Sequence, residues 1–275
     1  MVVQHNLTAA NTNRQLGITT NGLQKSTEKL SSGYKINRAA DDAAGLSISE
    51  KMRNQIRGLN KASDNAQDGI SLVQTAEGAL NEVHSMLQRM SELAVQAANG
   101  TNATTDRTAL NDEVQQLKTE IQRVGSTTQF NKMNILDGGF SAGKKKALQV
   151  GANANQTISI AISALTSVVG SSLTGNLRIS TATNAQSAIT TVQSSIEKLS
   201  TLRSKLGAVQ NRLEHTVANL DNISENTQSA ESRIRDTDMA EEMVQYSKNN
   251  ILQQAGQSML AQANQANQGV LSLLQ

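Results

Sequence analysis

The pattern in this sequence closest to a catalytic motif is a glycine-rich stretch that ends in lysines. Gly138 to Lys145 reads GGFSAGKK, close to the phosphate-binding pattern G-x-x-x-x-G-K-[ST]. Lys145 stands where that pattern needs a hydroxyl to bind magnesium, and no buried strand precedes the loop. The stretch therefore predicts a flexible β-turn and not a nucleotide site.

The sequence also gives no indication of thiol chemistry or of a metal site. The chain has no Cys, which excludes disulfides, thiolate nucleophiles and Cys-based zinc sites. His5, His84 and His215 are far apart in the sequence, and the last two lie beside hydrophobic rows where packing or surface roles are favoured. We expect no catalytic residue, no metal and no cofactor, and hence no enzyme.

Acidic residues gather at two places. Asp41-Asp42 suits a capping turn, although salt bridges between subunits are an open alternative. Asp236-Thr237-Asp238, with Glu241 and Glu242, suits a helix N-terminus and is too short for a calcium loop. Both clusters predict junctions between helices.

The amino-acid composition excludes further classes of protein. The 275 residues carry a formal net charge of +2, no Pro and only 1% aromatic residues, so large core side chains are scarce. No basic block exceeds Lys144-Lys145-Lys146, which argues against a nucleic acid partner. No long apolar run predicts membrane insertion, and Met1 to Asn6 lacks a signal-peptide pattern, so we expect a cytoplasmic protein or export by another route.

Two seven-residue hydrophobic repeats predict long helices, at about 56–98 and 186–227. The first helix alone would span roughly 60 Å, longer than a compact chain of this size is wide, so the sequence predicts an elongated rod. The residues that define the repeats are Leu59, Ala66, Val73, Leu80, Leu87 and Ala94 in the first, and Val192, Leu199, Leu206, Leu213 and Leu220 in the second.

Shorter elements fill the region between these helices. Asn99-Gly100 ends the first helix, and the apolar spacing from Leu110 to Val124 predicts a second helix that folds back as an antiparallel hairpin. Alternation at Ile158, Ile160 and Ile162 predicts a small β region within about 128–185. The polar residues of 163–187 predict a surface loop or hairpin tip.

Both ends of the chain are also helical in pattern and should pair. The C-terminal helix carries apolar residues off its expected seam, including Val244, Ile251 and Leu260, which pairing would leave uncovered. The sequence therefore predicts a subunit that assembles with other copies. The assembly candidates are Leu16, Leu23, Leu30, Leu252, Met259, Ala266 and Leu273.

Three segments resemble bacterial flagellin. They are LSSGYKINRAADDAAG at 30–45, NAQDGISLVQTAEGALNE at 65–82, and the C-terminal run from ILQQAG at 251 to VLSLL at 270–274. The resemblance covers about 1–135 and 186–275 and indicates a short form without large outer domains. It implies a homopolymeric, extracellular filament for swimming, exported unfolded through the flagellum, with an export apparatus, an export chaperone and a filament cap as partners.

The resemblance also implies domains and a receptor. Residues 1–42 and 236–275 would form the inner assembly domain, and 43–235 the rod domain. Leu87 to Gln96 is similar to the segment of flagellins bound by Toll-like receptor 5, although Ser91 replaces the Arg common there. Arg89, Leu93 and Glu113 are the receptor candidates, with Leu93 expected to be exposed just outside the hydrophobic seam.

The fold class expected is thus mainly α: a rod of long antiparallel helices with a small β-hairpin region and paired terminal helices. Two alternatives to a filament subunit stay open. A hook-filament junction protein would share the terminal helices but form a short adaptor, and a coiled-coil signalling module would form dimers without filaments.

Overall fold

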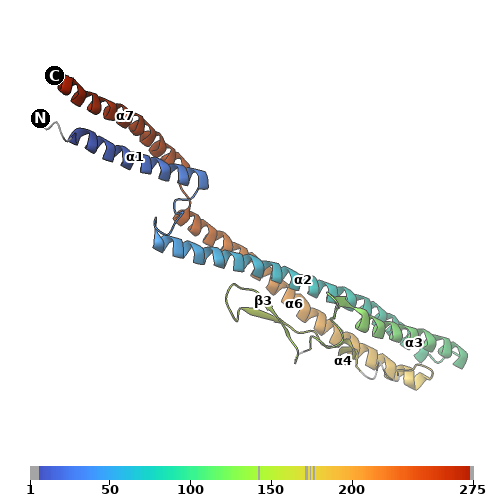
Figure 1. Ribbon diagram of the computed structural model, residues 1–275. Helices are drawn as coiled ribbons and strands as arrows, with labels where there is room; N and C mark the ends of the chain where they lie inside the picture. The colour runs from blue at the N-terminus through green and yellow to red at the C-terminus, as the bar shows by residue number, and fades with distance from the viewer. Residues whose placement is uncertain (1–5, 142, 171–172, 174, 176, 273–275) are drawn as a thin grey trace. The chain divides into compact units, whose positions relative to one another are not determined.

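The computed structural model describes residues 6–272 except 142, 171–172, 174 and 176, with side chains described up to residue 265 (Figure 1). The chain is mainly helical, as predicted, and forms two compact units, 1–55 with 225–275, and 56–224. Its elements in order are α1 (Leu7–Ser32), α2 (Ala43–Ala98), α3 (Thr104–Thr127), β1 (Gln129–Phe130), β2 (Met133–Asn134), β3 (Lys146–Gln149), β4 (Thr157–Ile160), α4 (Leu165–Val169), α6 (Ala182–Arg235) and α7 (Met239–Ser272).

The two heptad repeats form α2 and α6, and both helices extend beyond the predicted limits. Within unit 56–224 they run antiparallel: Ser63 Oγ donates to Asp221 Oδ1 at 3.1 Å, and Arg203 pairs with Glu77 at 3.5 Å. Gly69 lies in this contact, where its missing side chain leaves room for Leu148 and Leu213. A small residue in the seam therefore brings the helices and β3 close together.

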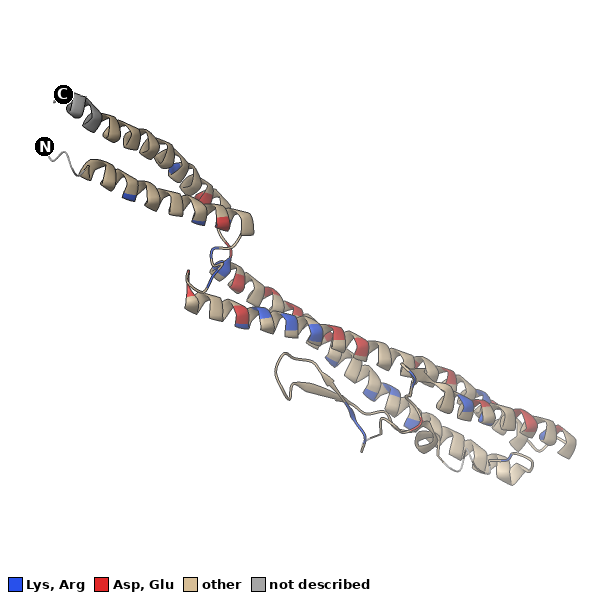
Figure 2. Ribbon diagram, viewed as in Figure 1, with Lys and Arg blue, Asp and Glu red and all other residues tan. Residues whose placement is uncertain are grey.

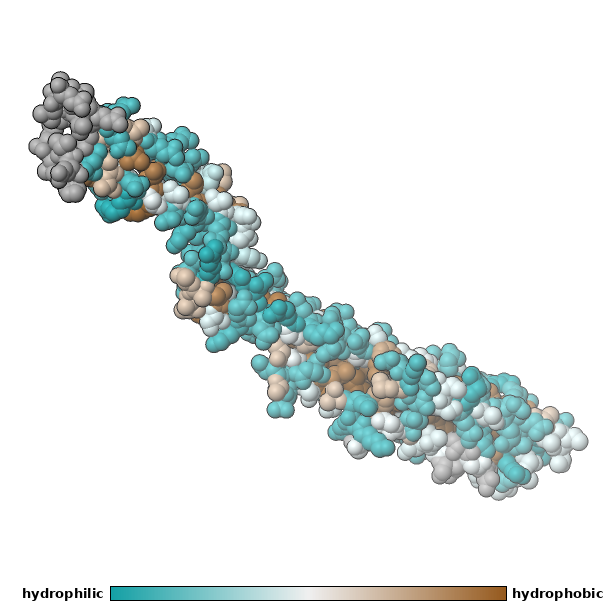
Figure 3. Space-filling model, viewed as in Figure 1, coloured by the Kyte–Doolittle hydropathy of each residue, from teal (hydrophilic) through white to brown (hydrophobic). Residues whose placement is uncertain are grey.

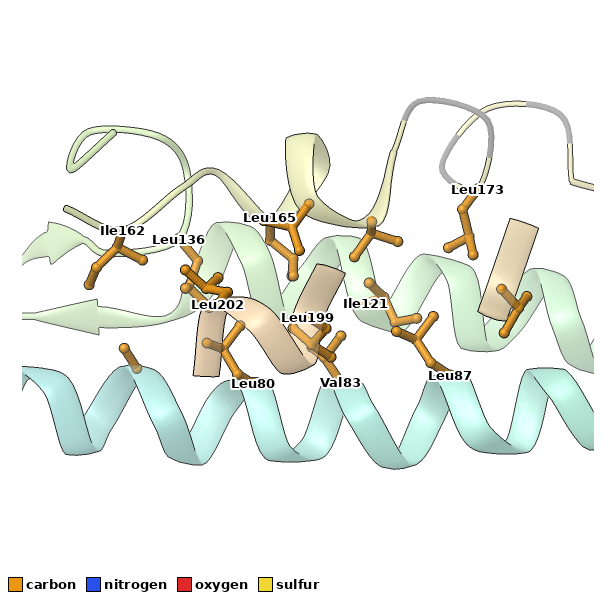
Figure 4. Close-up of a cluster of buried hydrophobic side chains, with 14 of the residues drawn as sticks. Leu80, Val83, Leu87, Ile121, Leu136, Ile162, Leu165, Leu173, Leu199 and Leu202 are labelled. Carbon is orange, nitrogen blue, oxygen red and sulfur yellow. The ribbon is translucent and has the colours of Figure 1, made fainter. Parts of the chain in front are cut away.

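A large apolar cluster fills most of unit 56–224, and a small separate cluster is formed by Leu59, Ala62 and Leu220. Figure 4 shows α2 supplying Leu80, Val83 and Leu87 to the large cluster, while the other labelled side chains close over them. The short helix α3 folds back along α2, which confirms the predicted hairpin. The remaining labelled members come from α3 (Ile121), α6 (Leu199 and Leu202) and the segment between them (Leu136, Ile162, Leu165 and Leu173).

Two antiparallel strand pairs make up the β structure. β1 pairs with β2, and β3 pairs with β4 in a register that sets Leu148 opposite Ile158. Ile158 and Ile160 are buried while their neighbours in β4 are exposed, as the alternation predicted. Gly138 has a φ of 101°, and Asp137 Oδ1 accepts from the Gly139 N–H at 2.8 Å, so the glycine-rich stretch opens with a turn.

The segment 163–187 differs from its prediction. Its apolar residues are not on the surface: Leu165, Val168 and Val169 of α4, together with Leu173, Leu177 and Ile179, are buried in the main cluster. The buried Ser195 Oγ of α6 donates to Val169 O at 2.8 Å, and this hydrogen bond attaches the end of α4 to α6. The polar composition of 163–187 predicted a surface loop wrongly. A small number of large apolar residues at suitable positions is enough to cover a groove between helices.

Candidate assembly and recognition surfaces

The terminal helices α1 and α7 pack against each other in antiparallel fashion, as predicted (Figure 1). Asn6 Nδ2 donates to Ala263 O at 3.1 Å at one end of the pair, and Lys29 Nζ lies 3.4 Å from Glu242 Oε2 at the other. Between these points Gly256 faces Leu16, because a Cβ on Gly256 would lie 3.3 Å from Leu16 Cδ1. The contact is therefore close along its length.

Few side chains are buried between α1 and α7. Ser26 is the one residue of described α1 that is fully buried, and Asn249 of α7 packs over Gly22. Leu16, Leu23 and Leu30 are half-buried on this inner face. Small and polar contacts remove little apolar surface from water, so the pair has a weak core of its own.

Apolar side chains instead lie on the outside of α7. At 3.6 residues per turn, they occupy both flanks of the helix and the side opposite α1. Figure 2 shows few charged residues on α1 and α7, and Figure 3 shows apolar atoms at the surface there. The exposed fractions are 48% for Met239, 49% for Met243, 66% for Val244, 66% for Ile251, 43% for Leu252 and 57% for Met259.

This arrangement corrects the predicted seam of α7. Leu252 and Met259 were expected in the row that pairs with α1, yet they are exposed, whereas Leu260, expected off the seam, is half-buried. Val244 and Ile251 are uncovered, as predicted. Gly256 and Ala263, which belong to the same expected row, do lie beside α1 and its N-cap residue Asn6. The side chain of Ala266 and the whole of Leu273 lie outside what the structure describes.

Acidic residues cap the helices at both junctions. Asp42 Oδ1 accepts from the Gly45 N–H at 2.9 Å at the start of α2, and Asp238 Oδ1 accepts from the Ala240 N–H at 2.8 Å at the start of α7. Asp41 Oδ2 accepts from the backbone N–H groups of Arg38 and Asn37, which lowers the pKa of Asp41. The capping interpretation of Asp41-Asp42 is thus confirmed. Salt bridges from these residues to another subunit stay an open alternative.

Arg235 ties the two junctions together. Its guanidinium lies 4.7 Å from the Tyr34 ring and 2.9 Å from Glu50 Oε1, and its backbone carbonyl accepts from the Lys35 N–H at 2.6 Å. A backbone bridge between Tyr34 and Asp236 runs beside these contacts. The chain segments that lead into α2 and out of α6 are therefore held side by side, and the end of α1 lies near the start of α7.

A second candidate surface lies where α2 and α3 run together. Arg89 Nε is 2.9 Å from Glu113 Oε1, and Arg89 Nη1 is 3.1 Å from Glu92 Oε2. These hydrogen bonds, that of Glu113 first, raise the pKa of Arg89 and fix its charge. The predicted juxtaposition of Arg89 and Glu113 is present. The predicted exposure of Leu93 is wrong: Leu93 is fully buried in the main cluster, because α2 is covered on more than one side, and exposed Val95 stands nearby.

No cluster of potential metal ligands occurs among the described residues, and none of the described helices is long and apolar enough to cross a membrane. His84 lies within hydrogen-bonding distance of Gln88, one turn along α2, at 3.2 Å. The surfaces that stand out are thus an apolar helix pair and a charged patch. Such a fold, with long helices and an uncovered apolar helix pair, defines a self-assembling structural subunit.

Comparison with known proteins identifies the family. Residues 3–141 match the bacterial flagellin N-terminal helical region, and residues 189–274 match the bacterial flagellin C-terminal helical region. The chain belongs to the bacterial flagellin family. It is a structural subunit of the flagellar filament of motile bacteria, an extracellular polymer of this subunit, and it is not an enzyme.

Individual relatives agree over the full length. The chain is 57% identical to a flagellin of Halalkalibacterium halodurans over 275 residues, covering 100% of both chains, and 48% identical to a flagellin of Bacillus subtilis, again covering 100% of both. The crystal structure of Bacillus cereus flagellin is 33% identical, with a TM-score of 0.51 over 57% of this chain and 88% of that one. A putative flagellar hook-associated protein of Vibrio parahaemolyticus, 10% identical with a TM-score of 0.61 over 71% of this chain and 100% of that one, shares the fold alone.

Proposed function

We propose that this subunit polymerises through the exposed apolar faces of α7, with α1 completing the assembly domain. The observation that carries the proposal is the exposure of six large apolar side chains on α7 outside the α1 contact. Because these side chains lie on both flanks and on the far side, one neighbouring helix could not cover them all. Each α7 should therefore contact more than one neighbouring copy.

Burial of these side chains supplies the driving force. A fully buried Leu, Ile or Met contributes about 1.5–3 kcal/mol. An aspartate at Leu252 or Met259 would remove that contribution and force a carboxylate into an apolar contact. Leu252→Asp and Met259→Asp should each raise the critical concentration for polymerisation about tenfold or more.

Sedimentation and electron microscopy of purified protein provide the test. Gln257 is an exposed polar residue of the same helix, so Gln257→Asp adds the same charge without removing apolar surface and serves as the matched control. Normal polymerisation of both Leu252→Asp and Met259→Asp would reject α7 as the assembly surface. Assembly of the unmodified protein into filaments of unlimited length argues against a hook-filament junction protein or a dimeric signalling module.

The same faces support proposals for export. Residues 1–42 and 236–275 would act as the inner assembly domain and 43–235 as the rod domain. Before assembly, an export chaperone would cover the α7 face, and the filament cap would guide its burial. The lack of Pro and Cys suits a chain that passes the export apparatus unfolded, since neither prolyl isomerisation nor disulfide exchange would delay refolding.

We also propose that Toll-like receptor 5 recognises the monomer at Arg89 and Glu113. The ion pair between α2 and α3 holds both groups in place at the surface, and a fixed Arg is a common anchor of protein interfaces. Leu93 is not part of this proposal, since its side chain is buried. Residues in this patch would be covered in the filament, so the monomer should bind far better than an equal mass of filament.

Binding of purified monomers to the receptor by surface plasmon resonance tests the recognition surface. Arg89→Ala should weaken binding by about 1–3 kcal/mol, the range for a central interface Arg. Arg123, which pairs with Glu120 on α3, is a matched exposed Arg, and Arg123→Ala should leave affinity unchanged. Equal affinity of Arg89→Ala and the unmodified monomer, or no binding by the latter, would reject the surface.

A further inference from the structure

The turn between α2 and α3 contains an Asn-Gly pair in a reactive setting. Asn99 and Gly100 directly follow the last residue of α2, and both are exposed. A Cβ added to Gly100 would meet no atom within 4 Å, so the chain around it is open. Among the described residues, no acceptor bonds the Gly100 N–H, whereas the Asn99 N–H is bonded to Gln96 O at 3.2 Å.

Neighbouring asparagines show how specific this setting is. Asn102, in the same turn, is followed by Ala103, whose N–H is held by Asp106 Oδ2 at 3.0 Å. The Asn102 amide is itself bonded to Gln96 O. The other Asn-Gly pair, Asn21-Gly22, lies within α1, where the Gly N–H belongs to the helical ladder. Of the two described Asn-Gly pairs, Asn99-Gly100 is therefore the one in which an exposed carboxamide precedes a glycine N–H that no described acceptor bonds.

We propose that Asn99 is a site of spontaneous conversion to isoaspartate. The Gly100 nitrogen attacks Asn99 Cγ, the new N–Cγ bond forms a succinimide, and the carboxamide nitrogen leaves as ammonia, which carries off the Gly100 amide proton. Water then adds to one succinimide carbonyl and breaks its bond to the Gly100 nitrogen. Attack at the former main-chain carbonyl leaves the chain linked through Cγ and frees that carbonyl carbon as a carboxylate.

Arg107 directs the second step toward isoaspartate. Its Nη2 donates to Asn99 O at 3.0 Å and its Nε to Ala97 O at 2.9 Å, so the guanidinium already holds the oxygen that becomes part of the new carboxylate. A cation at this carbonyl oxygen polarises the carbon toward water and then pairs with the product through a charge-assisted hydrogen bond. Arg107 also offsets the unfavourable effect of a negative charge at the C-terminus of α2.

The conversion alters the molecule in two ways. It lowers the formal net charge of +2 by one, and it lengthens the main chain of the turn by one carbon. Both changes fall in the α2–α3 turn of unit 56–224, and none of the residues of the α1–α7 contact belongs to that unit. Polymerisation through α7 should therefore be unaffected by the conversion. A failure of this proposal would leave the proposed assembly surface untouched, and the reverse also holds.

Ageing of purified full-length monomer at mildly alkaline pH tests the proposal. Peptide mapping by mass spectrometry separates Asp from isoAsp, and isoaspartyl methyltransferase with S-adenosylmethionine counts isoaspartate independently. We expect isoaspartate to accumulate at Asn99, with Asn102 unchanged as the internal comparison. Gly100→Ala, which adds bulk at the attacking residue, should slow the reaction strongly.

Arg107 variants test the directing role. Arg107→Gln should lower the ratio of isoAsp to Asp at residue 99 about two- to fivefold, the factor that an exposed charge interaction corresponds to. Arg107→Lys keeps the charge and should retain most of the preference, and Arg123→Gln on the same helix is the control. Conversion at Asn99 no faster than at Asn102 would overturn the site, and an unchanged ratio in Arg107→Gln would overturn the role of Arg107.

Discussion

Two glycines of α2 should respond in opposite ways to the same substitution. Gly69 is buried, and a Cβ there would clash with Leu148 Cδ1 and lie 3.3 Å from Leu213 Cδ1. Gly78 is exposed on the same helix and has no such neighbour within 4 Å. Both sit mid-helix, where Ala is favoured over Gly by about 0.8–1.0 kcal/mol. Only the cost of overpacking separates them.

The expected magnitudes follow from that difference. Gly78→Ala should stabilise the protein by about 0.5–1 kcal/mol, because it gains helix propensity and meets nothing. Gly69→Ala gains the same propensity but pays an overpacking cost of about 1–3 kcal/mol, since Leu148 must move within a paired strand. The two variants should therefore differ by about 1–3 kcal/mol, with Gly69→Ala the less stable.

Thermal unfolding followed by circular dichroism measures the difference. For a unit of this size a change of 1 kcal/mol shifts Tm by about 2–4 °C. A second substitution, Leu148→Ala, removes the clashing methyl groups, so Gly69→Ala should cost less in that background than alone. Equal stabilisation by Gly69→Ala and Gly78→Ala would refute the close packing of α2 against β3.

Other substitutions probe the core and the helix caps. Leu87→Ala, at a fully buried position, should lower the free energy of unfolding by about 2.7–5 kcal/mol in denaturant titration, and a loss under 1 kcal/mol would contradict its burial. Asp238→Ala removes the side chain that caps α7 and should cost about 0.5–2 kcal/mol, seen as faster amide exchange of Ala240 and Glu241; unchanged exchange would argue against the cap. The lowered pKa of Asp41 means that its bonds to Asn37 and Arg38 stabilise the fold above the unfolded pKa of about 3.9 and are lost as the pH falls through the lower folded value. Amide shifts of Asn37 and Arg38 should follow this titration in NMR spectra, and a titration that persists in Asp41→Asn would disprove the assignment.

The helices themselves could be predicted from the sequence because their signals are local. Heptad spacing predicted α2 and α6, Asn99-Gly100 and the apolar spacing from Leu110 bounded the α2–α3 turn, and the acidic residues at 41–42 and 236–238 marked the junctions. Capping and periodicity depend on residues a few positions apart, so the chain carries them whatever it later packs against. The paired ends and the uncovered apolar surface of α7 followed from the same patterns.

The neighbours of each helix face were decided by the tertiary structure. Leu93 lies off the two-helix seam of α2 and so suggested exposure, but α3 and the segment after β4 add further layers over α2 and bury it. Leu252 and Met259 fitted the seam of α7 by spacing, in one row with Gly256 and Ala263, yet the two small residues are partly covered while Leu252 and Met259 are exposed. Periodicity fixes which residues share a face, and it cannot fix how many partners cover that face, because those partners come from distant parts of the chain and are chosen by the sum of their packing.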